Sequence, residues 1–323
     1  MELMNNKKIL YVHGFASSGQ TGTVTTIKEY LPGAEVIAPD LPLHPAEAIA
    51  NLKEICEKEQ PDLIIGTSMG GMFAEQLRGF DRILVNPAFR MGETLVSNNM
   101  VGRQEYTNPR RDGQQEFIVT KALVKEFKDV TEQCFKDITP EEKERVWALF
   151  GDEDQFMSTS EEYKAHYPSA ISFHGGHRMN DKTFLNSVMP VIRWIDDKRE
   201  ERERPTIFIS IETLRDDYMH PRSSSQKTFK FLLESYNIYI VAPVGRENSG
   251  QMDDDRSWAD EHINVPAYRH ILFTDSPELL MGDYLISSLP SSGRFLGTAV
   301  EFGSPDFKSW DDIHRYFELL GGQ

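Results

Sequence analysis

Cysteine is scarce in this 323-residue sequence, which contains only Cys56 and Cys134. The two fall in different predicted helical regions, so we expect free thiols rather than a fold held by disulfide bonds. Long apolar runs are also missing, which excludes a membrane-spanning helix. The first predicted strand begins almost at the N-terminus and leaves no room for a signal peptide. These features predict a cytoplasmic protein with no membrane partner.

Basic residues are outnumbered, because 35 Lys and Arg stand against 51 Asp and Glu and the formal net charge is −16. A surface of that sign repels phosphate backbones and anionic lipids, so we expect no nucleic-acid partner. The chain is long enough for two domains with ordinary cores. Composition therefore excludes classes of partner and leaves the chemistry to the motifs.

A Gly-Thr-Ser-Met-Gly stretch at residues 66–70 is the most informative motif of the chain. The apolar residues 62–65 before it predict a buried strand, and residues 69–77 after it predict a helix. A serine at such a strand-to-helix turn is held with its hydroxyl exposed at the sheet edge, and the flanking glycines let the turn close. The pattern therefore makes Ser68 a candidate nucleophile.

An acidic turn follows a second predicted strand, residues 145–150. An acid just past a strand end can accept a hydrogen bond from an imidazole and fix its tautomer. Asp154 is the preferred candidate, Asp152 is the reserve, and Glu153 is third. A solvated acidic loop without a catalytic role is the alternative.

A histidine loop follows a third predicted strand, residues 170–173. His177 comes after two glycines that allow the loop to return over the sheet edge, whereas His174 is expected to be a structural strand-end residue. The chain order of serine, acid and histidine is that of the α/β-hydrolases. We therefore predict Ser68, Asp154 and His177 as a catalytic triad.

The loop after the first predicted strand, residues 8–12, can supply a backbone N–H donor for acyl transfer. A tetrahedral intermediate carries an oxyanion that needs preorganised N–H donors. The backbone N–H of Met69, directly after the serine, is one candidate, and that of Phe15 is the other. His13 is expected to pin this loop rather than act as a base.

Residues from about 8 to 195 resemble the YqiA-like family of small bacterial esterases. The resemblance lies in residues 9–15, 38–42, 66–71, 84–88 and 175–177. It implies hydrolysis of a small-molecule carboxylic ester or thioester through an acyl-enzyme on Ser68, with no cofactor and no metal. It does not identify the substrate or its acyl chain.

Strands and helices alternate in this first half, with helices predicted over residues 22–31 and 45–59. Such alternation predicts a parallel sheet covered on both faces. Because the chain starts at the strand before the oxyanion loop, we expect a trimmed sheet without leading antiparallel strands.

Residues 90–143 are polar and irregular, and hydrolases insert a lid at this position. Phe117, Phe127 and Phe135 are candidates to close over the serine, while a surface excursion that never meets substrate is an equal alternative. The segment also carries basic residues, for which a solvated face is favoured over a site for an acidic acyl carrier: Arg90, Arg103, Arg110 and Arg111.

A charged run at residues 196–204, ended by Pro205, predicts a linker between two domains, 1–200 and 205–323. The second domain is predicted to be another α/β layer fold, with strands at 206–211, 238–241, 271–273 and 284–286 and helices at 223–235 and 310–320.

The second domain resembles the 5′(3′)-deoxyribonucleotidases of the haloacid dehalogenase (HAD) superfamily, in residues 236–243, 257–262, 282–286 and 302–304. The resemblance implies two aspartates after the first strand, where this chain has Ser210 and Glu212, and an aspartate pair where it has Ser287 and Ser288. The phosphate-binding lysine expected near residues 275–277 is absent as well. Magnesium prefers anionic oxygens and aspartyl-phosphate chemistry needs a carboxylate nucleophile.

We therefore expect an α/β-hydrolase domain followed by a smaller HAD-like domain without phosphatase activity. The second domain is left with a binding, regulatory or structural role, including a possible homo-oligomer interface. The alternative is a non-enzymatic protein that uses both domains as binding modules.

Overall fold

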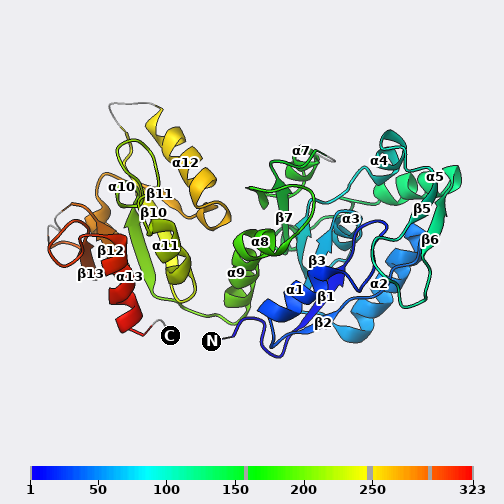
Figure 1. Cartoon of the computed structure of the whole chain (residues 1–323), viewed down its shortest axis with the longest axis horizontal. Helices are drawn as coiled ribbons and strands as arrows, with labels where there is room; N and C mark the ends of the chain where they lie inside the picture. The colour runs from blue at the N-terminus through cyan, green and yellow to red at the C-terminus, as the bar shows by residue number, and fades with distance from the viewer. Residues whose placement is uncertain (1, 156–158, 246–249, 290–292, 322–323) are drawn as a thin grey trace. The chain divides into compact units, whose positions relative to one another are not determined.

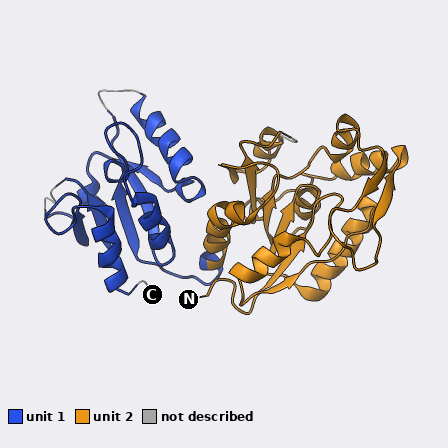
Figure 2. Cartoon of the chain, viewed as in Figure 1, with its two compact units in different colours: residues 1, 197–323 blue, residues 2–196 orange. Residues whose placement is uncertain are grey.

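A computed structural model describes residues 2–155, 159–245, 250–289 and 293–321. The chain divides into two compact units, one from Glu2 to Asp196 and one from Asp197 onward (Figure 2). Helix α9, Met189–Arg199, contains the division, a few residues before the predicted linker ends. Each unit is described by itself below.

The first unit is built on a six-stranded sheet with the order β2-β1-β3-β4-β7-β8 (Figure 1). Every pairing in it is parallel, as the alternation of strands and helices predicts. Its inner strands β1, β3 and β4 are buried on both faces and therefore contain nearly continuous apolar runs. The bounds of the strands are Lys8–Val12 (β1), Glu35–Ile37 (β2), Leu63–Thr67 (β3), Asp81–Val85 (β4), Val146–Gly151 (β7) and Ala170–Phe173 (β8).

The strand order reverses at β1, because β2 lies on one side of it and β3 on the other. In open parallel sheets, ligands bind outside the carboxyl ends of the strands at such a reversal. The loops after β1 and β3 therefore meet at the expected position for a site. The helices that connect the strands of this sheet include α1 (Gly22–Tyr30), α2 (Pro45–Glu59), α3 (Met69–Glu75) and α7 (Ser160–Lys164). After β8 follow α8 (Asp181–Thr183), a π-helical turn at Phe184–Val188 and α9.

The segment between β4 and β7 is more regular than the sequence suggested. It contains α4 (Met91–Ser97), an antiparallel hairpin of β5 (Gly102–Glu105) and β6 (Glu116–Val119), α5 (Lys121–Thr131) and α6 (Pro140–Lys143). Helix α5 begins at Thr120, whose hydroxyl accepts from the amide of Leu123. Its apolar side, Leu123, Val124 and Phe127, is buried in the main core.

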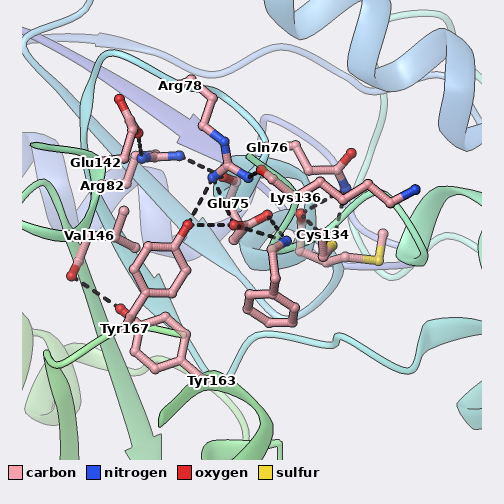
Figure 3. A network of polar contacts seen from close by, with 12 residues as sticks. Glu75, Gln76, Arg78, Arg82, Cys134, Lys136, Glu142, Val146, Tyr163 and Tyr167 are labelled. Atoms are coloured by element: carbon pink, nitrogen blue, oxygen red, sulfur yellow. Dashed lines mark hydrogen bonds and ion pairs between the residues drawn. The ribbon is translucent and has the colours of Figure 1, made fainter. Parts of the chain in front are cut away.

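A buried ionic network joins the end of α3 to the start of β4 (Figure 3). The Glu75 carboxylate is fully buried and accepts from Arg78 at 2.8 Å and from the Tyr167 hydroxyl at 2.5 Å. Arg82, also fully buried, donates to the Glu75 carbonyl at 2.5 Å and pairs with Glu142. Burial and the nearby Glu75 raise the pKa of Tyr167, which remains a neutral donor. The network fixes the helix that begins directly after Ser68.

The second unit holds a five-stranded parallel sheet with the order β11-β10-β9-β12-β13. The sequence predicted four of these strands and missed β13 and the helix α12. The bounds are Thr206–Ser210 (β9), Asn237–Ala242 (β10), Ile271–Phe273 (β11), Tyr284–Ser287 (β12), Thr298–Glu301 (β13), Ile211–Leu214 (α10), Ser225–Leu233 (α11), Gln251–His262 (α12) and Trp310–Leu319 (α13). A capping box of Ser309 and Asp312 starts α13.

Candidate active site

Ser68 lies on a strained turn between β3 and α3. Its φ of 53° is in the left-handed region, which a non-glycine residue adopts at a cost of about 1–3 kcal/mol. The turn closes only because the residues two positions before and after Ser68 are glycines. A Cβ on Gly70 would lie 2.0 Å from the Val12 carbonyl oxygen, and one on Gly66 would lie 2.4 Å from the Gly70 carbonyl oxygen. The G-x-S-x-G pattern thus has the steric origin that the sequence predicted.

His177 joins Ser68 to Asp154 by two hydrogen bonds. Its Nε2 lies 3.0 Å from Ser68 Oγ, and its Nδ1 lies 2.8 Å from Asp154 Oδ2. An ionised carboxylate only accepts, so Nδ1–H donates to Asp154 and leaves Nε2 to accept from the serine hydroxyl. The Asp154 side chain is 2% exposed and the His177 side chain 22% exposed. The arrangement can remove the hydroxyl proton of Ser68 when that oxygen attacks a carbonyl carbon.

The other two acids of the turn bond to His174 and Gly175. Asp152, the reserve candidate, pairs with His174 and also accepts from the Gly175 amide at 3.1 Å. Glu153 donates its amide to the Gly175 carbonyl at 3.1 Å. A Cβ on Gly151 would lie 2.3 Å from that same carbonyl oxygen, so this close approach of the two loops requires glycine. Asp152 and His174 thus join the acid turn to the histidine loop.

The two predicted oxyanion donors, Met69 and Phe15, belong to segments next to Ser68. Met69 follows it as the first residue of α3. Phe15 follows Gly14, where a Cβ would lie 3.4 Å from the Cβ of Ser68. The loop after β1 therefore runs directly past the serine. Backbone N–H groups must lie this close if they are to donate to the oxyanion that forms when the serine attacks a substrate carbonyl.

His13 holds this loop as a neutral imidazole. Its Nδ1 lies 2.8 Å from the Gly14 carbonyl and therefore donates, so its Nε2 accepts from the Leu41 amide at 3.1 Å. Burial is the main cause that lowers the pKa of His13 to about 4. Both ring nitrogens are occupied, which leaves no atom of His13 for proton transfer and agrees with the structural role predicted for it.

His13 gives a specific pH dependence of stability. Its pKa falls from 6.5 to about 4 on folding, so the unfolded state binds more protons between these values. The stabilisation is complete above pH 6.5 and is lost as the pH falls towards 4, by at most about 3 kcal/mol. Urea unfolding between pH 7 and 4 is expected to show this loss in the wild type and not in His13→Asn. Parallel curves for the two proteins would contradict the assignment.

The aromatic residues proposed as a lid separate into two groups. Phe117 and Phe127 contact the Phe15 ring edge-on, with centroids 5.4 and 6.0 Å away. Phe135 instead donates its amide to Glu75 and stacks on His166. It therefore lies at the opposite end of α3 from Ser68, and the expectation that it closes over the serine is wrong.

All four arginines of this segment form ion pairs. Arg90 pairs with Glu162, Arg103 with Glu116, Arg110 with Asp112 and Arg111 with Asp40. Arg110 also donates to the Leu41 carbonyl, and Arg111 to the Ala38 carbonyl. The last two thus bind the loop after β2, and the set does not form an uncompensated cationic face.

Asn86, which sequence reasoning did not single out for a role, is 3% exposed and contacts both the acid turn and the histidine loop. The signal was an Asn-Pro pair directly after a buried strand, which is typical of a specialised turn.

In the second unit, the positions where the nucleotidase resemblance implies catalytic aspartates lie together at the carboxyl ends of neighbouring strands. Ser210 ends β9 and Ser287 ends the neighbouring β12. The Glu212 carboxylate accepts from the Ser288 hydroxyl at 3.1 Å and lies 3.5 Å from the Ser287 hydroxyl. One carboxylate bound to hydroxyl groups is a poor match for the anionic oxygens that Mg²⁺ requires.

Among the described residues, no cluster of three or more His, Cys, Asp or Glu has the spacing of a metal site. The helices in the same ranges include none with the length and apolar character needed to cross a bilayer.

The site contains a serine, a histidine and an acid that are joined by hydrogen bonds, each on a loop after a strand of one parallel sheet. This arrangement is the one found in α/β-hydrolases. Residues 8–184, more than half of the chain, match UPF0227, described as an uncharacterised protein family, and the chain belongs to that family. This match confirms the family resemblance of the first segment.

A curated protein of Vibrio phage KVP40, named "Putative 5'(3')-deoxyribonucleotidase", is 26% identical over 137 residues, which are 41% of this chain and 76% of that protein. This similarity confirms the nucleotidase resemblance of part of the chain.

Solved structures with a similar fold include a Paleococcus ferrophilus monoacylglycerol lipase (TM-score 0.43, 16% identity, 61% of this chain and 96% of that one). The esterase domain of a Rhodothermus marinus protein is another (TM-score 0.42, 18% identity, 61% of this chain and 90% of that one). Likeness at this level does not assign an activity.

Proposed function

We propose that the first unit is a serine hydrolase that cleaves carboxylic esters or thioesters through an acyl-enzyme on Ser68. The observation that carries the proposal is the continuous hydrogen-bonded path from Ser68 through His177 to the buried Asp154. The names of the lipase and esterase among the similar structures agree with it.

The proposed reaction has two steps. Ser68 Oγ attacks the substrate carbonyl carbon while its proton moves to His177 Nε2, and the amides of Met69 and Phe15 bind the oxyanion. The C–O or C–S bond to the leaving group then breaks, and His177 donates the proton to the departing alcohol or thiol. Water, deprotonated by His177, hydrolyses the acyl-enzyme and frees Ser68. No metal or organic cofactor takes part.

For the second unit we propose a binding, regulatory or structural role without phosphatase chemistry. Support comes from Ser210 at the end of β9 and from the hydrogen bonds that Ser287 and Ser288 make to Glu212. A hydroxyl at Ser210 cannot form the acyl phosphate that an aspartate nucleophile forms. We therefore expect no Mg²⁺-dependent release of phosphate from deoxynucleoside monophosphates, measured as inorganic phosphate. Release that survives Ser68→Ala but is lost in Glu212→Gln would contradict this assignment.

The ester hydrolase proposal is tested with a p-nitrophenyl ester series from acetate to decanoate. Turnover that depends on Ser68 is expected, and the chain length with the highest kcat/KM reports the size of the acyl site. A thioester series is the second substrate set. Absence of turnover in both would favour the alternative, a binding protein that retains the residues of a hydrolase.

A further inference from the structure

Asn86 is placed by an unusual backbone turn at the end of β4. Its φ is 46°, in the left-handed region, where asparagine is among the few non-glycine residues found often. The side chain is 3% exposed. Since β4 is the neighbour of β7, and β7 of β8, this turn lies beside the loops that follow those two strands.

The side-chain amide of Asn86 is fully used in joining these loops. Its Oδ1 accepts from the Gly151 amide at 2.7 Å, where the acid turn begins. Its Nδ2 donates to the carbonyls of Gly176 and His177, both at 3.0 Å. Both hydrogens of the NH₂ group thus go to the histidine loop, and the oxygen goes to the acid turn.

The backbone around Asn86 holds the nucleophile as well. The Ser68 amide donates to the Val85 carbonyl at 2.9 Å, and the Ala88 amide donates to the Ser68 carbonyl at 3.0 Å. The Asn86 amide itself donates to the Leu149 carbonyl of β7 at 2.8 Å. Residues 85–88 therefore contact all three loops that carry Ser68, Asp154 and His177.

We propose that Asn86 is a positioning residue for ester hydrolysis, an inference that rests on the function proposed above. Its two donated bonds fix the backbone of the histidine loop and so hold the His177 ring between Ser68 and Asp154. Gly175 and Gly176 have no side chains to anchor this loop, so backbone hydrogen bonds hold it. The Asn86 bonds hold Gly176 and His177, beside the bonds that Gly175 makes to Asp152 and Glu153. A displacement of about 1 Å at a catalytic group can reduce turnover about 100-fold.

Two substitutions separate positioning from folding. Asn86→Asp keeps the size, the tolerance of positive φ and the acceptor for Gly151, but it sets a carboxylate against the two carbonyl oxygens of the histidine loop. Asn86→Gly keeps the backbone turn and removes all three bonds. Gln76→Ala is the matched control, because the Gln76 amide donates to Met72 and Cys134 at the far end of α3.

The first readouts are KM and kcat, with kcat normalised to the concentration of Ser68 that a fluorophosphonate labels to completion. The second readout is the downfield proton signal of the His177 Nδ1–H. We expect kcat to fall about 10- to 100-fold in both Asn86 variants with KM within threefold of wild type, and the signal to weaken or disappear. Gln76→Ala should keep kcat within threefold and retain the signal.

The inference is overturned if both Asn86 variants retain kcat within threefold, or if Gln76→Ala loses as much. A wild-type protein with no turnover and no fluorophosphonate labelling would reject the proposed function instead. The Nδ1–H signal still tests the positioning in that case, because it does not require turnover: an unchanged signal in both Asn86 variants rejects it.

Discussion

Ser68→Ala and His177→Ala are each expected to lower kcat for ester hydrolysis by about 10⁴- to 10⁶-fold. Ser68 Oγ lies 3.0 Å from His177 Nε2, within hydrogen-bonding distance. Removing either partner leaves the oxyanion donors and substrate binding without a nucleophile or a base. Because the two act as a unit, the double variant should lose little more than either single one.

Asp154 refines this test. Asp154→Asn keeps the size of the side chain but offers an NH₂ group to Nδ1, which favours the wrong imidazole tautomer and should cost about 10⁴-fold in kcat. Asp152→Asn is the control, since Asp152 pairs with His174, and it should retain most activity. The assay is steady-state hydrolysis of the best p-nitrophenyl ester. Equal losses in the two variants would contradict the assignment of Asp154 as the triad acid.

Glu75→Gln is expected to lower the free energy of unfolding by about 3 kcal/mol, the cost of breaking a buried ion pair. Glu75 is fully buried and binds Arg78, Tyr167 and the Phe135 amide (Figure 3). The neutral amide leaves the Arg78 charge without its buried partner and presents donors where the carboxylate only accepts.

Glu161→Gln is the matched control for Glu75→Gln. Glu161 pairs with Lys164 on the surface, where its side chain is 84% exposed, and such pairs contribute about 0–1 kcal/mol. Thermal unfolding of the three proteins should therefore show a shift of several degrees for Glu75→Gln alone. Equal melting temperatures in all three would mean that the network does not stabilise the unit.

The prediction of Ser68, Asp154 and His177 as a triad rests on a steric or chemical signature after each of three strands. Ser68 needs flanking glycines, His177 follows two glycines, and Asp154 ends an acidic turn. The sequence favoured Asp154 and kept Asp152 in reserve, since which carboxylate turns inward depends on the fold. The structure places Asp154 on His177 and Asp152 on His174.

Other features depend on contacts distant in the chain. Phe135 was grouped with Phe117 and Phe127 because it is aromatic and lies in the same segment, yet the Glu75 network holds it at the other end of α3. The sequence did not predict the β5–β6 hairpin, because Gly102–Glu105 is polar and lacks the alternation of apolar and polar residues that is typical of a half-buried strand. Asn86 lies in residues 84–88, which carry part of the family resemblance, and its role could not be predicted because the loops it joins are brought together only by the sheet.

The position of β8 bears on when the contact between His177 and Ser68 is present. This strand is at one margin of the six-stranded sheet, paired only with β7, and it delivers His177 to a serine 109 residues earlier in the chain. Opening an edge strand of a sheet costs less free energy than opening a central strand. Departure of β8 alone would separate the imidazole from Ser68 while β1, β3 and β4 stay paired. We therefore expect the contact between Ser68 and His177 to be lost on mild denaturation ahead of the bulk of the sheet.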